Sequence, residues 1–292
     1  MTITVASGKG GTGKTLVATS LALSIGENAQ FLDCDVEEPN GYIFLKPEIK
    51  KTIKICLPKP TIDIKRCSFC GRCRSACHYN AISVIKPGNK SRGKVLFFYE
   101  LCHSCGACAL VCPENAIYEK EEEKGTVEIG TARGIFSFIQ GKLKVAEPSP
   151  VPVVKAVKKH IRQDRVNIID ACPGTSCPVV EAVKGADFCI LVTEPTPFGL
   201  NDLALALGMT KKMGIPSGII INRADIGDKE VENYAKKQGI PILLHIPFQR
   251  QIAVSYSRGI PLVSIFPEYV STLKEIFTRI AHEILKNRKE YE

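Results

Sequence analysis

The sequence predicts an α/β protein with a doubly wound, mostly parallel sheet and a small α+β unit inserted into it. Short apolar runs have the composition of buried parallel strands, and they cover residues 2–6, 31–32, 168–170, 188–193, 217–221 and 242–244. Segments with helical apolar spacing lie between them, at residues 15–25, 178–184, 200–213 and 228–238. Strands that alternate with crossover helices form parallel sheets with helices on both faces.

The chain has 292 residues, of which 45% are hydrophobic, enough for one large α/β core and one small accessory unit. From Val36 to about Lys59 the sequence is rich in Pro and Lys, and we interpret it as an irregular linker. Glu119 to Lys124 is interpreted as a charged turn. Domain boundaries are therefore predicted near residues 59 and 125, so that residues 1–59 and 126–292 form the main domain and residues 60–125 the insert.

Residues 270–285 predict a C-terminal helix with one apolar face. That face carries Leu273, Ile276, Phe277, Ile280, Ile284 and Leu285. Packing against the sheet is the favoured interpretation, and the basic residues Lys274, Arg279 and Lys286 on the other face leave a membrane-surface helix as the alternative. No apolar stretch approaches the ~18 residues that span a bilayer, and the first residues lack the charged region of a signal peptide. We therefore expect a cytoplasmic protein without a transmembrane segment.

Two runs of cysteines are the strongest local signal in the sequence. Eight of the 13 cysteines follow the spacing C-x2-C-x2-C-x3-C, and they are Cys67, Cys70, Cys73 and Cys77, then Cys102, Cys105, Cys108 and Cys112. The second run repeats the first after 35 residues, and Asn-Ala-Ile at 80–82 recurs at 115–117, which indicates an internal duplication. In a chain of this length such tight spacing favours metal ligation in a reducing compartment over disulfides.

Thiolates at this spacing are typical ligands of [4Fe-4S] clusters, so the two runs predict two clusters. Structural zinc is the alternative, but zinc sites usually pair two C-x2-C knuckles across a longer spacer. The segment resembles the bacterial two-cluster ferredoxin fold; Pro113 matches the proline after its fourth cysteine, and His78 replaces that proline in the first run. The resemblance implies crossed ligation, with one cluster on Cys67, Cys70, Cys73 and Cys112 and the other on Cys102, Cys105, Cys108 and Cys77.

The formal charge of +9 falls to roughly +5 when each cluster with its thiolates contributes about −2. No nucleic-acid recognition motif accompanies the charge, so specific nucleic-acid binding is not expected. Within residues 61–94, Asp63 is the one acidic residue against Lys65, Arg66, Arg72, Arg74, Lys86, Lys90, Arg92 and Lys94. These cations either dock an acidic redox partner or offset the cluster charge, and the sequence leaves both open.

The N-terminal residues contain a phosphate-binding loop between a predicted strand and a predicted helix. Its residues are Gly8, Lys9, Gly10, Gly11, Thr12, Gly13, Lys14 and Thr15, in the pattern G-x4-G-K-T. The glycines let backbone N–H groups close on phosphate oxygens, Lys14 reaches the β- and γ-phosphates, and Thr15 ligates Mg2+. The loop therefore predicts that the chain binds ATP and Mg2+.

Lys9 adds a second lysine to this loop, which then resembles the deviant Walker A motif of the MinD, ParA, Mrp and nitrogenase iron-protein superfamily. The resemblance covers essentially all of the chain outside the insert. It implies a homodimer in which Lys9 reaches the partner's nucleotide. Asp33 and Asp35 match the switch I aspartates, with Asp35 orienting the attacking water, and Asp170 matches the Walker B or switch II aspartate.

Two further matches concern the nucleotide base. Asn222 and Arg223 follow the predicted strand at 217–221, and they match a pair that lies near the adenine in these proteins. Pro247 belongs to the corresponding base-contacting loop, but Gln249 stands where relatives often have an aspartate. The resemblance therefore assigns Asn222 and Arg223 to cofactor binding.

The architecture as a whole resembles MinD-superfamily ATPases that contain an inserted ferredoxin domain. This implies ATP hydrolysis by in-line attack of water, with charge stabilised by Lys14, Mg2+ and Lys9 of the partner subunit. The favoured hypothesis couples a nucleotide-driven dimer cycle to electron transfer to an unidentified redox or iron–sulfur acceptor protein, because the insert follows Asp35 closely in sequence. The alternatives are an iron–sulfur cluster carrier or assembly factor of the Mrp type, and a MinD-like positioning ATPase.

The cysteines outside the two runs are Cys34, Cys56, Cys172, Cys177 and Cys189. Cys34 and Cys189 are expected to be small buried apolar side chains. Cys172 and Cys177 flank Pro173-Gly174, and the nitrogenase iron protein is similar in having a cysteine beyond its switch II aspartate that helps hold a cluster shared between subunits. We favour a structural role for this pair, with a further cluster at Cys177 as the alternative.

Overall fold

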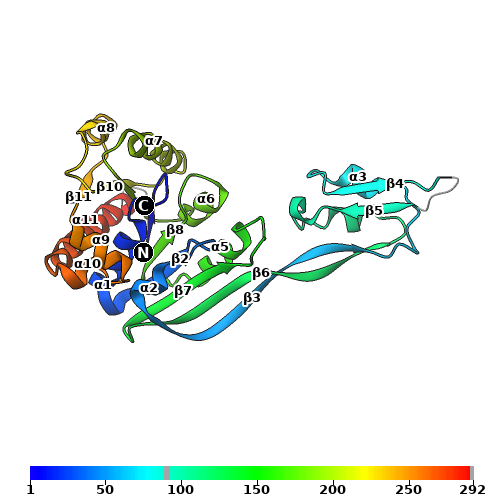
Figure 1. Cartoon of the computed structure of the whole chain (residues 1–292), viewed down its shortest axis with the longest axis horizontal. Coiled ribbons are helices and arrows are strands. Elements are labelled where there is room, and N and C mark those ends of the chain that lie inside the picture. Colours follow the sequence, from blue (N-terminus) through cyan, green and yellow to red (C-terminus); the bar gives the residue numbers. More distant parts are fainter. Residues whose placement is uncertain (89–92, 290–292) are drawn as a thin grey trace. The chain divides into compact units, whose positions relative to one another are not determined.

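The chain consists of two compact units in the computed structural model, which describes residues 1–88 and 93–289 (Figure 1). The first, which we call the sheet unit, contains Met1–Ile53, Thr126–Leu143 and Pro150–Glu292. The second, the cysteine unit, contains Lys54–Gly125 and Lys144–Ser149. Besides the expected insert of residues 60–125, the cysteine unit thus includes residues 54–59 and 144–149.

The described residues form a nine-stranded sheet in the order β11-β10-β9-β1-β8-β2-β7-β6-β3. Its strands are β1 (Thr2–Ala6), β2 (Ala29–Cys34), β3 (Pro47–Ile62), β6 (Ile117–Ala132), β7 (Phe136–Leu143), β8 (Val166–Ala171), β9 (Phe188–Thr193), β10 (Ser217–Asn222) and β11 (Ile242–Ile246). The pairings among β1, β2 and β7 to β11 are parallel. The predicted α/β fold with a mostly parallel sheet is confirmed.

Two segments differ from the sequence prediction. Residues 36–59, expected to be an irregular linker, contain helix α2 (Gly41–Leu45) and most of β3. Residues 119–124, expected to be a charged turn, lie within β6. Much of each segment is exposed, with Lys124 a buried exception, so neither has the apolar run that marks a buried strand. Strand β3 is also the edge strand of the sheet, where charged side chains are typical.

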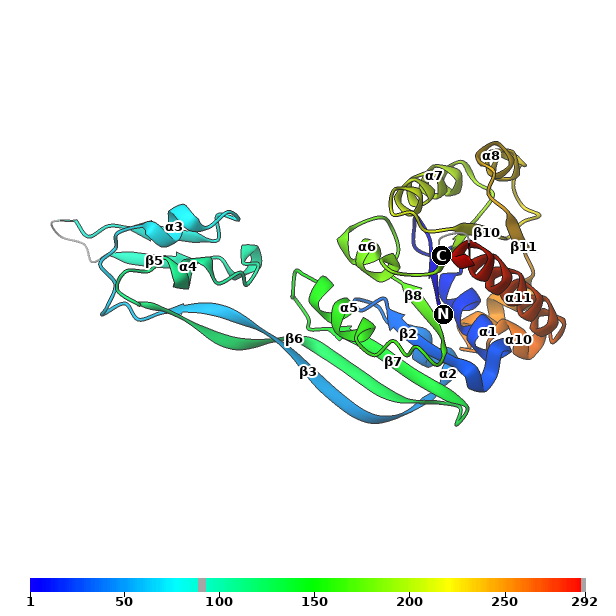
Figure 2. The same ribbon diagram turned by 180° about the vertical axis from the view of Figure 1, so that it is seen from behind.

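Helices cover the sheet on both sides. In Figures 1 and 2, α1, α10 and α11 lie together on one side, and α5, α6 and α7 lie on the other. The helices of the sheet unit are α1 (Lys14–Ile25), the 3-10 helix η1 (Gly26–Asn28), α2, α5 (Val151–Lys158), α6 (Cys177–Val183), α7 (Pro197–Lys212), α8 (Glu230–Gln238), α9 (Arg250–Ser257), α10 (Leu262–Ile265) and α11 (Glu268–Lys289). The helices predicted at 15–25, 178–184, 200–213 and 228–238 are confirmed.

The apolar face of α11 is part of the main hydrophobic core. Leu273, Ile276, Ile280 and Ile284 are buried in the same cluster as side chains of α1 and β1, whereas Leu285 is 54% exposed. The favoured interpretation of this helix, packing against the body of the sheet unit, is therefore confirmed for every predicted residue except Leu285, since the partly buried Phe277 also packs against this core. A helix whose apolar face is already buried has little left to insert into a membrane surface.

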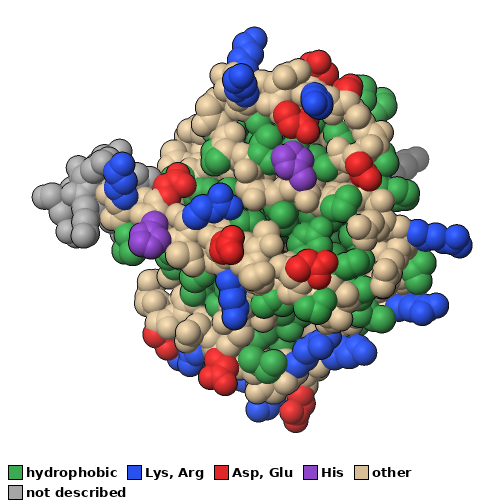
Figure 3. Space-filling model, turned by 90° about the vertical axis from the view of Figure 1, so that its left-hand side faces the viewer, with side chains coloured by type: hydrophobic (Ala, Val, Ile, Leu, Met, Phe, Trp, Pro, Cys, Tyr) green, Lys and Arg blue, Asp and Glu red, His purple; other side chains and the backbone are tan. Residues whose placement is uncertain are grey.

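The outer surface of the sheet unit carries charges of both signs. On the face shown in Figure 3, Lys and Arg side chains are interspersed with Asp and Glu side chains and with hydrophobic ones. In the part of the chain that the structure describes, no helix has both the length and the apolar composition needed to cross a bilayer.

The cysteine unit repeats itself in backbone conformation as well as in sequence. Its elements besides β3 and β6 are α3 (Arg72–Ala76), β4 (Ile82–Ile85), β5 (Lys94–Phe97), the 3-10 helix η2 (Tyr99–Leu101) and α4 (Ala107–Leu110). Left-handed conformations recur 35 residues apart, at Phe69 and Ser104, Gly71 and Gly106, and Asn80 and Asn115. Strands β4 and β5 pair antiparallel. The small core of the unit contains Cys73, Ile82, Cys108 and Ile117.

Replacing Ile276 by alanine tests the assignment of α11 to the core. Ile276 is fully buried, so Ile276→Ala should lower the free energy of unfolding by roughly 2–5 kcal/mol through lost burial and the cavity left behind. The exposed Leu285 of the same helix provides a control, because Leu285→Ala should change the free energy of unfolding by less than about 0.5 kcal/mol. Urea denaturation followed by circular dichroism measures both; equal effects would contradict the assignment.

Candidate functional site

The phosphate-binding loop runs from the end of β1 to the first residue of α1, Lys14. Gly11 and Gly13 have φ angles of 80° and 98°, which strain any residue with a side chain. Asn222, at the end of β10, donates from Nδ2 to the carbonyl oxygen of Thr12 at 2.9 Å. The same Nδ2 lies 2.6 Å from the place that a Cβ on Gly13 would occupy. Asn222 therefore holds the loop in shape, and only glycine fits beside it.

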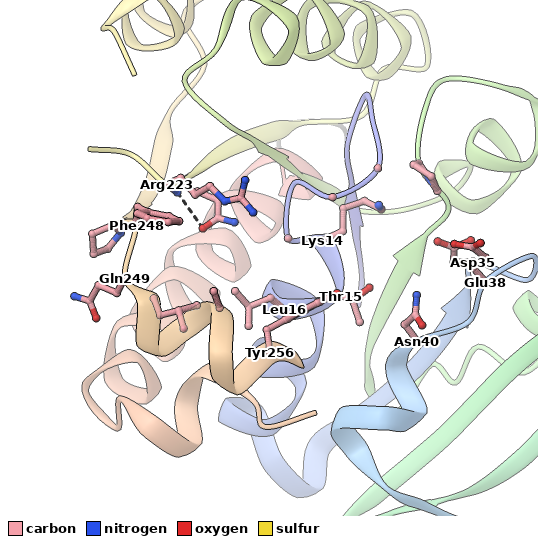
Figure 4. Close-up of a pocket in the computed structure, with 18 residues that line it drawn as sticks. Lys14, Thr15, Leu16, Asp35, Glu38, Asn40, Arg223, Phe248, Gln249 and Tyr256 are labelled. Atoms are coloured by element: carbon pink, nitrogen blue, oxygen red, sulfur yellow. Dashed lines mark hydrogen bonds between the residues drawn. The ribbon is translucent and has the colours of Figure 1, made fainter. Parts of the chain in front are cut away.

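A pocket opens from this loop between the ends of β1, β2 and β10 (Figure 4). Its lining consists of Gly10, Gly11, Gly13, Lys14, Thr15, Leu16, Asp35, Glu38, Asn40, Pro173, Asn222, Arg223, Pro247, Phe248, Gln249, Ile252, Ala253 and Tyr256. Figure 4 shows the polar side chains of Asp35, Glu38 and Asn40 at one end of the pocket and Arg223, Phe248 and Gln249 at the other. Lys14 and Asp35 face the same space from opposite sides (Figure 4). A polar end beside a helix N-terminus and a more apolar far end suit a phosphate chain joined to a flat base.

Three loop residues expected to bind nucleotide do not line the pocket. Gly8 packs against α7, where an added Cβ would come within 2.2 Å of the carbonyl oxygen of Asp202. Thr12 is 1% exposed, and its carbonyl accepts the hydrogen bond from Asn222. Lys9 pairs with a carboxylate of its own chain. Gly8 and Thr12 thus contribute packing that shapes the loop.

Helix α9 supplies a wall of the pocket that the sequence prediction missed. Ile252, Ala253 and Tyr256 come from one face of this helix. The ring of Tyr256 packs on that of Phe44, with centroids 4.8 Å apart. The i, i+1, i+4 spacing of these residues could have indicated a buried face, but nothing in it distinguishes a pocket from a core.

Three aspartates lie at or behind the phosphate loop; Asp35 lines the pocket, whereas Asp33 and the predicted site residue Asp170 are buried and do not. Asp33 and Asp170 are register neighbours on β2 and β8, and both are buried. Asp33 accepts hydrogen bonds from the backbone N–H groups of Asp35 (3.1 Å) and Gly41 (2.9 Å). Burial and Asp170 raise the pKa of Asp33 well above its usual range. Asp33 therefore shapes the loop that carries Asp35, a different task from contacting the ligand.

Asp170 has the properties of a cation site. Neither of its carboxylate oxygens has a hydrogen-bond partner among the described residues. Burial raises the pKa of Asp170 to about 6, against the opposing effect of Lys14, and burial with Asp170 raises the pKa of Asp35 to about 7. Mg2+ prefers oxygen ligands and keeps several waters, so the carboxylate of Asp170 with the hydroxyl of Thr15 is a donor set that fits it.

Lys9 and Arg223 meet on one buried carboxylate. Glu194 follows β9 and is 6% exposed. Its Oε2 lies 3.4 Å from Nζ of Lys9 and its Oε1 lies 3.0 Å from a terminal guanidinium nitrogen of Arg223. The sequence prediction did not include Glu194, although an acidic residue directly after an apolar strand was a usable signal. Within a single chain, Lys9 is therefore turned toward Glu194.

The eight thiols of the two cysteine runs line two separate cavities in the cysteine unit. One is lined by Cys67, Cys70, Cys73 and Cys112, with Pro113 beside them. The other is lined by Cys77, Cys102, Cys105 and Cys108. Each cavity thus combines three thiols of one run with the fourth of the other.

Backbone N–H groups point at the sulfurs of these cavities. Equivalent residues of the repeat, Ala81 and Ala116, donate to Sγ of Cys77 (3.2 Å) and Cys112 (3.3 Å). Phe69 donates to Sγ of Cys67 at 3.4 Å. Hydrogen bonds of this kind stabilise thiolates and tune the metal centres that they hold.

The thiols are not arranged around a single metal ion. Across residues 1–88 and 93–289, no group of three or more His, Cys, Asp or Glu side chains is placed to hold one ion. A structural zinc requires four ligands at about 2.0–2.3 Å from one centre. Four thiols, three from one run and one from the other, are a donor set that would fit a polynuclear iron–sulfur group, in which thiolates bind different irons.

The remaining cysteines are dispersed. Cys34 and Cys189 are buried, as expected, and Cys56 is exposed. Cys172 is buried, which raises the pKa of its thiol to about 12, whereas Cys177 is exposed at the start of α6. A buried, neutral Cys172 is consistent with the structural role favoured for it.

Comparisons with known proteins agree with the site in the sheet unit. A family profile described as CobQ/CobB/MinD/ParA nucleotide binding domain (CbiA) matches residues 3–262. The Methanocaldococcus jannaschii protein named Uncharacterized protein MJ0579 is 30% identical over 266 residues, which cover 89% of this chain and 90% of that protein. A Pyrococcus horikoshii protein named iron-sulfur cluster carrier protein is 30% identical over 139 residues, 42% of this chain and 46% of that protein.

Among solved structures, the septum site-determining protein MinD of Pyrococcus horikoshii, complexed with Mg-ADP, superposes with a TM-score of 0.56. The match covers 97% of this chain and 96% of that chain, at 20% sequence identity. At this identity the likeness supports the fold of the sheet unit alone.

Asp170→Asn should separate two effects of the buried carboxylate: its destabilisation of the folded chain and its binding of Mg2+. Because its pKa is raised in the folded chain, the Asp170 carboxyl keeps its proton at pH values at which the unfolded chain has lost it. The stability that this bound proton contributes is therefore lost as pH rises from about 4 through about 6. Without cation, the variant should therefore be more stable than the wild type by about 2 kcal/mol near pH 8, with a smaller gain near pH 5. The variant should also lose the stabilisation that MgCl2 gives the wild type.

Thermal unfolding at the two pH values, with and without MgCl2, measures this difference. Asp164→Asn is the control, because Asp164 is exposed and its pKa is lowered by Arg162. A gain for Asp170→Asn that is the same at both pH values would contradict the assignment.

Proposed function

Since the chain belongs to the CobQ/CobB/MinD/ParA nucleotide-binding family and is a P-loop ATPase of the MinD/ParA type, we propose that it couples a nucleotide-driven dimer cycle to electron transfer through two [4Fe-4S] clusters. The observation that carries the proposal is the crossed lining of two cavities by eight thiols in a chain that also has an ATP pocket. Neither site is explained by the other, so a function that uses both is favoured.

In the proposed ATPase site, the loop N–H groups and Lys14 bind the phosphates, while Thr15 and Asp170 hold Mg2+, which neutralises phosphate charge. Asp35 orients the attacking water. Asn222 and Arg223 lie at the base. Lys9 would act on the nucleotide of the partner subunit in a homodimer, for which it must first leave Glu194, 3.4 Å away. This contact supports slow turnover by an isolated chain.

In the proposed iron–sulfur domain, residues 60–125, each cavity holds one cluster. The ligands would be Cys67, Cys70, Cys73 and Cys112 in the first cavity and Cys77, Cys102, Cys105 and Cys108 in the second. Bound clusters supply one-electron redox chemistry. The N–H groups of Ala81 and Ala116 would stabilise the negative charge on the ligand sulfurs. Residues 1–59 and 126–292 would form the ATPase domain.

The coupling is supported by the path of the chain. The loop that carries Asp35 is tied at one end to Leu143, whose N–H donates to the carbonyl oxygen of Val36 at 2.7 Å. It ends at Gly41, where α2 begins and leads to β3. Strand β3 continues without interruption into the cysteine unit. A change in the position of Asp35 on hydrolysis could therefore reach the cysteine unit along the chain, through α2 and β3.

An iron–sulfur cluster carrier is the second candidate. It is favoured by the partial similarity to proteins named iron-sulfur cluster carrier protein. Against it, four of the eight thiols lie in the core or pack on it, among them Cys73 and Cys108, whereas a carrier needs ligands that release their cluster readily. A MinD-like positioning role would leave the thiol-lined cavities without a purpose.

The two lysines of the phosphate loop should have separable effects. Lys14→Ala should weaken ATP binding by at least about tenfold, because Lys14 lines the pocket. Lys9→Ala should keep ATP binding but lower turnover by about a hundredfold or more, as expected for a charge supplied from the partner subunit. Fluorescent nucleotide titration and phosphate release measure the two quantities, with the exposed Lys229→Ala as control. Loss of binding in Lys9→Ala would contradict the assigned role.

Purification without oxygen tests the cluster assignment. The protein should contain about eight irons and eight sulfides per chain and show the absorption of [4Fe-4S] clusters. Cys112→Ser should remove the cluster in the first cavity, which Cys112 lines together with three thiols of the first run. Replacing the exposed Cys56 by serine should leave the iron and sulfide content unchanged. Colourless or zinc-loaded protein would refute the assignment. Release of iron and sulfide to an apo-acceptor on addition of ATP would favour the carrier.

A further inference from the structure

Four cations lie within two residues of Cys67 or Cys73, which line the first cavity, and we call them the basic face: Lys65, Arg66, Arg72 and Arg74. All four side chains are exposed, and Arg72 lines the cavity itself. None of them forms an ion pair with any described residue. Asp63, the nearest carboxylate in sequence, accepts a hydrogen bond from the backbone N–H of Lys65 instead. The positive charge therefore stays available to another molecule.

The internal repeat shows that these cations are not needed to build the site. Their equivalents 35 residues later, around the second cavity, are Glu100, Leu101, Ala107 and Ala109. The backbone is the same in both halves, with left-handed glycines at Gly71 and Gly106 and short helices α3 and α4 directly after them. Four thiols line the second cavity without any of the four cations. Beside the second cavity the buried Lys59 donates to the carbonyl oxygen of Cys102 at 3.1 Å. One cation thus accompanies that site, and offsetting the charge of a bound cluster does not account for four exposed cations at the other.

We propose that the basic face docks an acidic one-electron carrier protein, and that electrons are exchanged with that carrier at the first cavity. This rests on the proposed function. Cys70 is exposed within the basic face, so a docked partner approaches a ligand sulfur directly. The exposed Ile64 adds an apolar contact beside the cations, as protein interfaces usually combine the two.

The step itself is a single electron transfer. The reduced centre of the carrier loses one electron, the group held by Cys67, Cys70, Cys73 and Cys112 gains it, and no bond is made or broken. Complementary charge raises the rate of encounter 10- to 1000-fold at low salt, and the effect is lost at high salt. Lys86 and Lys94 are also exposed in this unit; Lys90 and Arg92 lie outside the described residues.

Replacing the four cations by the residues at the equivalent positions of the second half of the repeat tests the proposal, because those residues already occur in the same backbone context. We call this variant the transplant. The variant K65E/R66L/R72A/R74A carries at the first cavity the residues of the second, and it changes the formal charge by −5. The matched control, K229E/K236A/K237A/K274A, changes the charge by the same amount at exposed positions of the sheet unit. Iron and sulfide content is measured first in all three proteins, so failure of the proposed function is recognised separately.

The probe is an acidic plant-type ferredoxin. Stopped-flow transfer from the reduced ferredoxin should slow at least tenfold in the transplant at low ionic strength, stay within about twofold in the control, and converge at high salt. Calorimetric binding of ferredoxin, which needs no cluster in the chain, should follow the same order. An unchanged rate and affinity in the transplant, an equal loss in the control, or tighter binding of the basic face to duplex DNA or anionic vesicles than to ferredoxin would overturn the proposal.

Discussion

The buried carboxylate of Asp33 makes the contact on which the proposed coupling depends. It accepts hydrogen bonds from the backbone N–H groups of Asp35 and Gly41 and so fixes the loop from β2 to α2. Its neighbour in the sheet is Asp170, which together with burial raises the pKa of Asp33. A cation at Asp170 would lower this repulsion, and Asp33 would pass the change to both ends of the loop. Because α2 leads to β3, the proposed coupling would act on the strand that enters the cysteine unit.

Two thiols of the cysteine unit are part of its core as well as of the proposed cluster sites. A unit of this size buries little apolar surface, and small domains often need a metal to stay folded. Cys73 and Cys108, at equivalent positions of the repeat, form its core with Ile82 and Ile117. Binding of a metal group at these thiols would therefore contribute to folding. The sheet unit has its own core, so the two units can gain or lose stability separately.

The sequence predicted the parts of the molecule in which chemistry and local pattern coincide. The phosphate loop, the buried parallel strands and the helices between them were found because glycine spacing and apolar periodicity are local. Strand β3 and the first half of β6 were missed because both are largely exposed, so that their residues resemble a linker. Glu194 and the α9 residue Tyr256 were missed for another reason: each reaches the site through tertiary packing, which no local pattern records.

The proposed coupling between nucleotide and clusters can be tested by measuring the reduction potential of the bound clusters with ATP, with ADP and without nucleotide. We expect the potentials with ATP and ADP to differ by about 60 mV or more, a tenfold change in a one-electron equilibrium. The difference should vanish in Lys14→Ala at a nucleotide concentration that saturates the wild type but not this variant, while the clusters are retained. Potentials that are the same in all nucleotide states of the wild type would contradict the coupling.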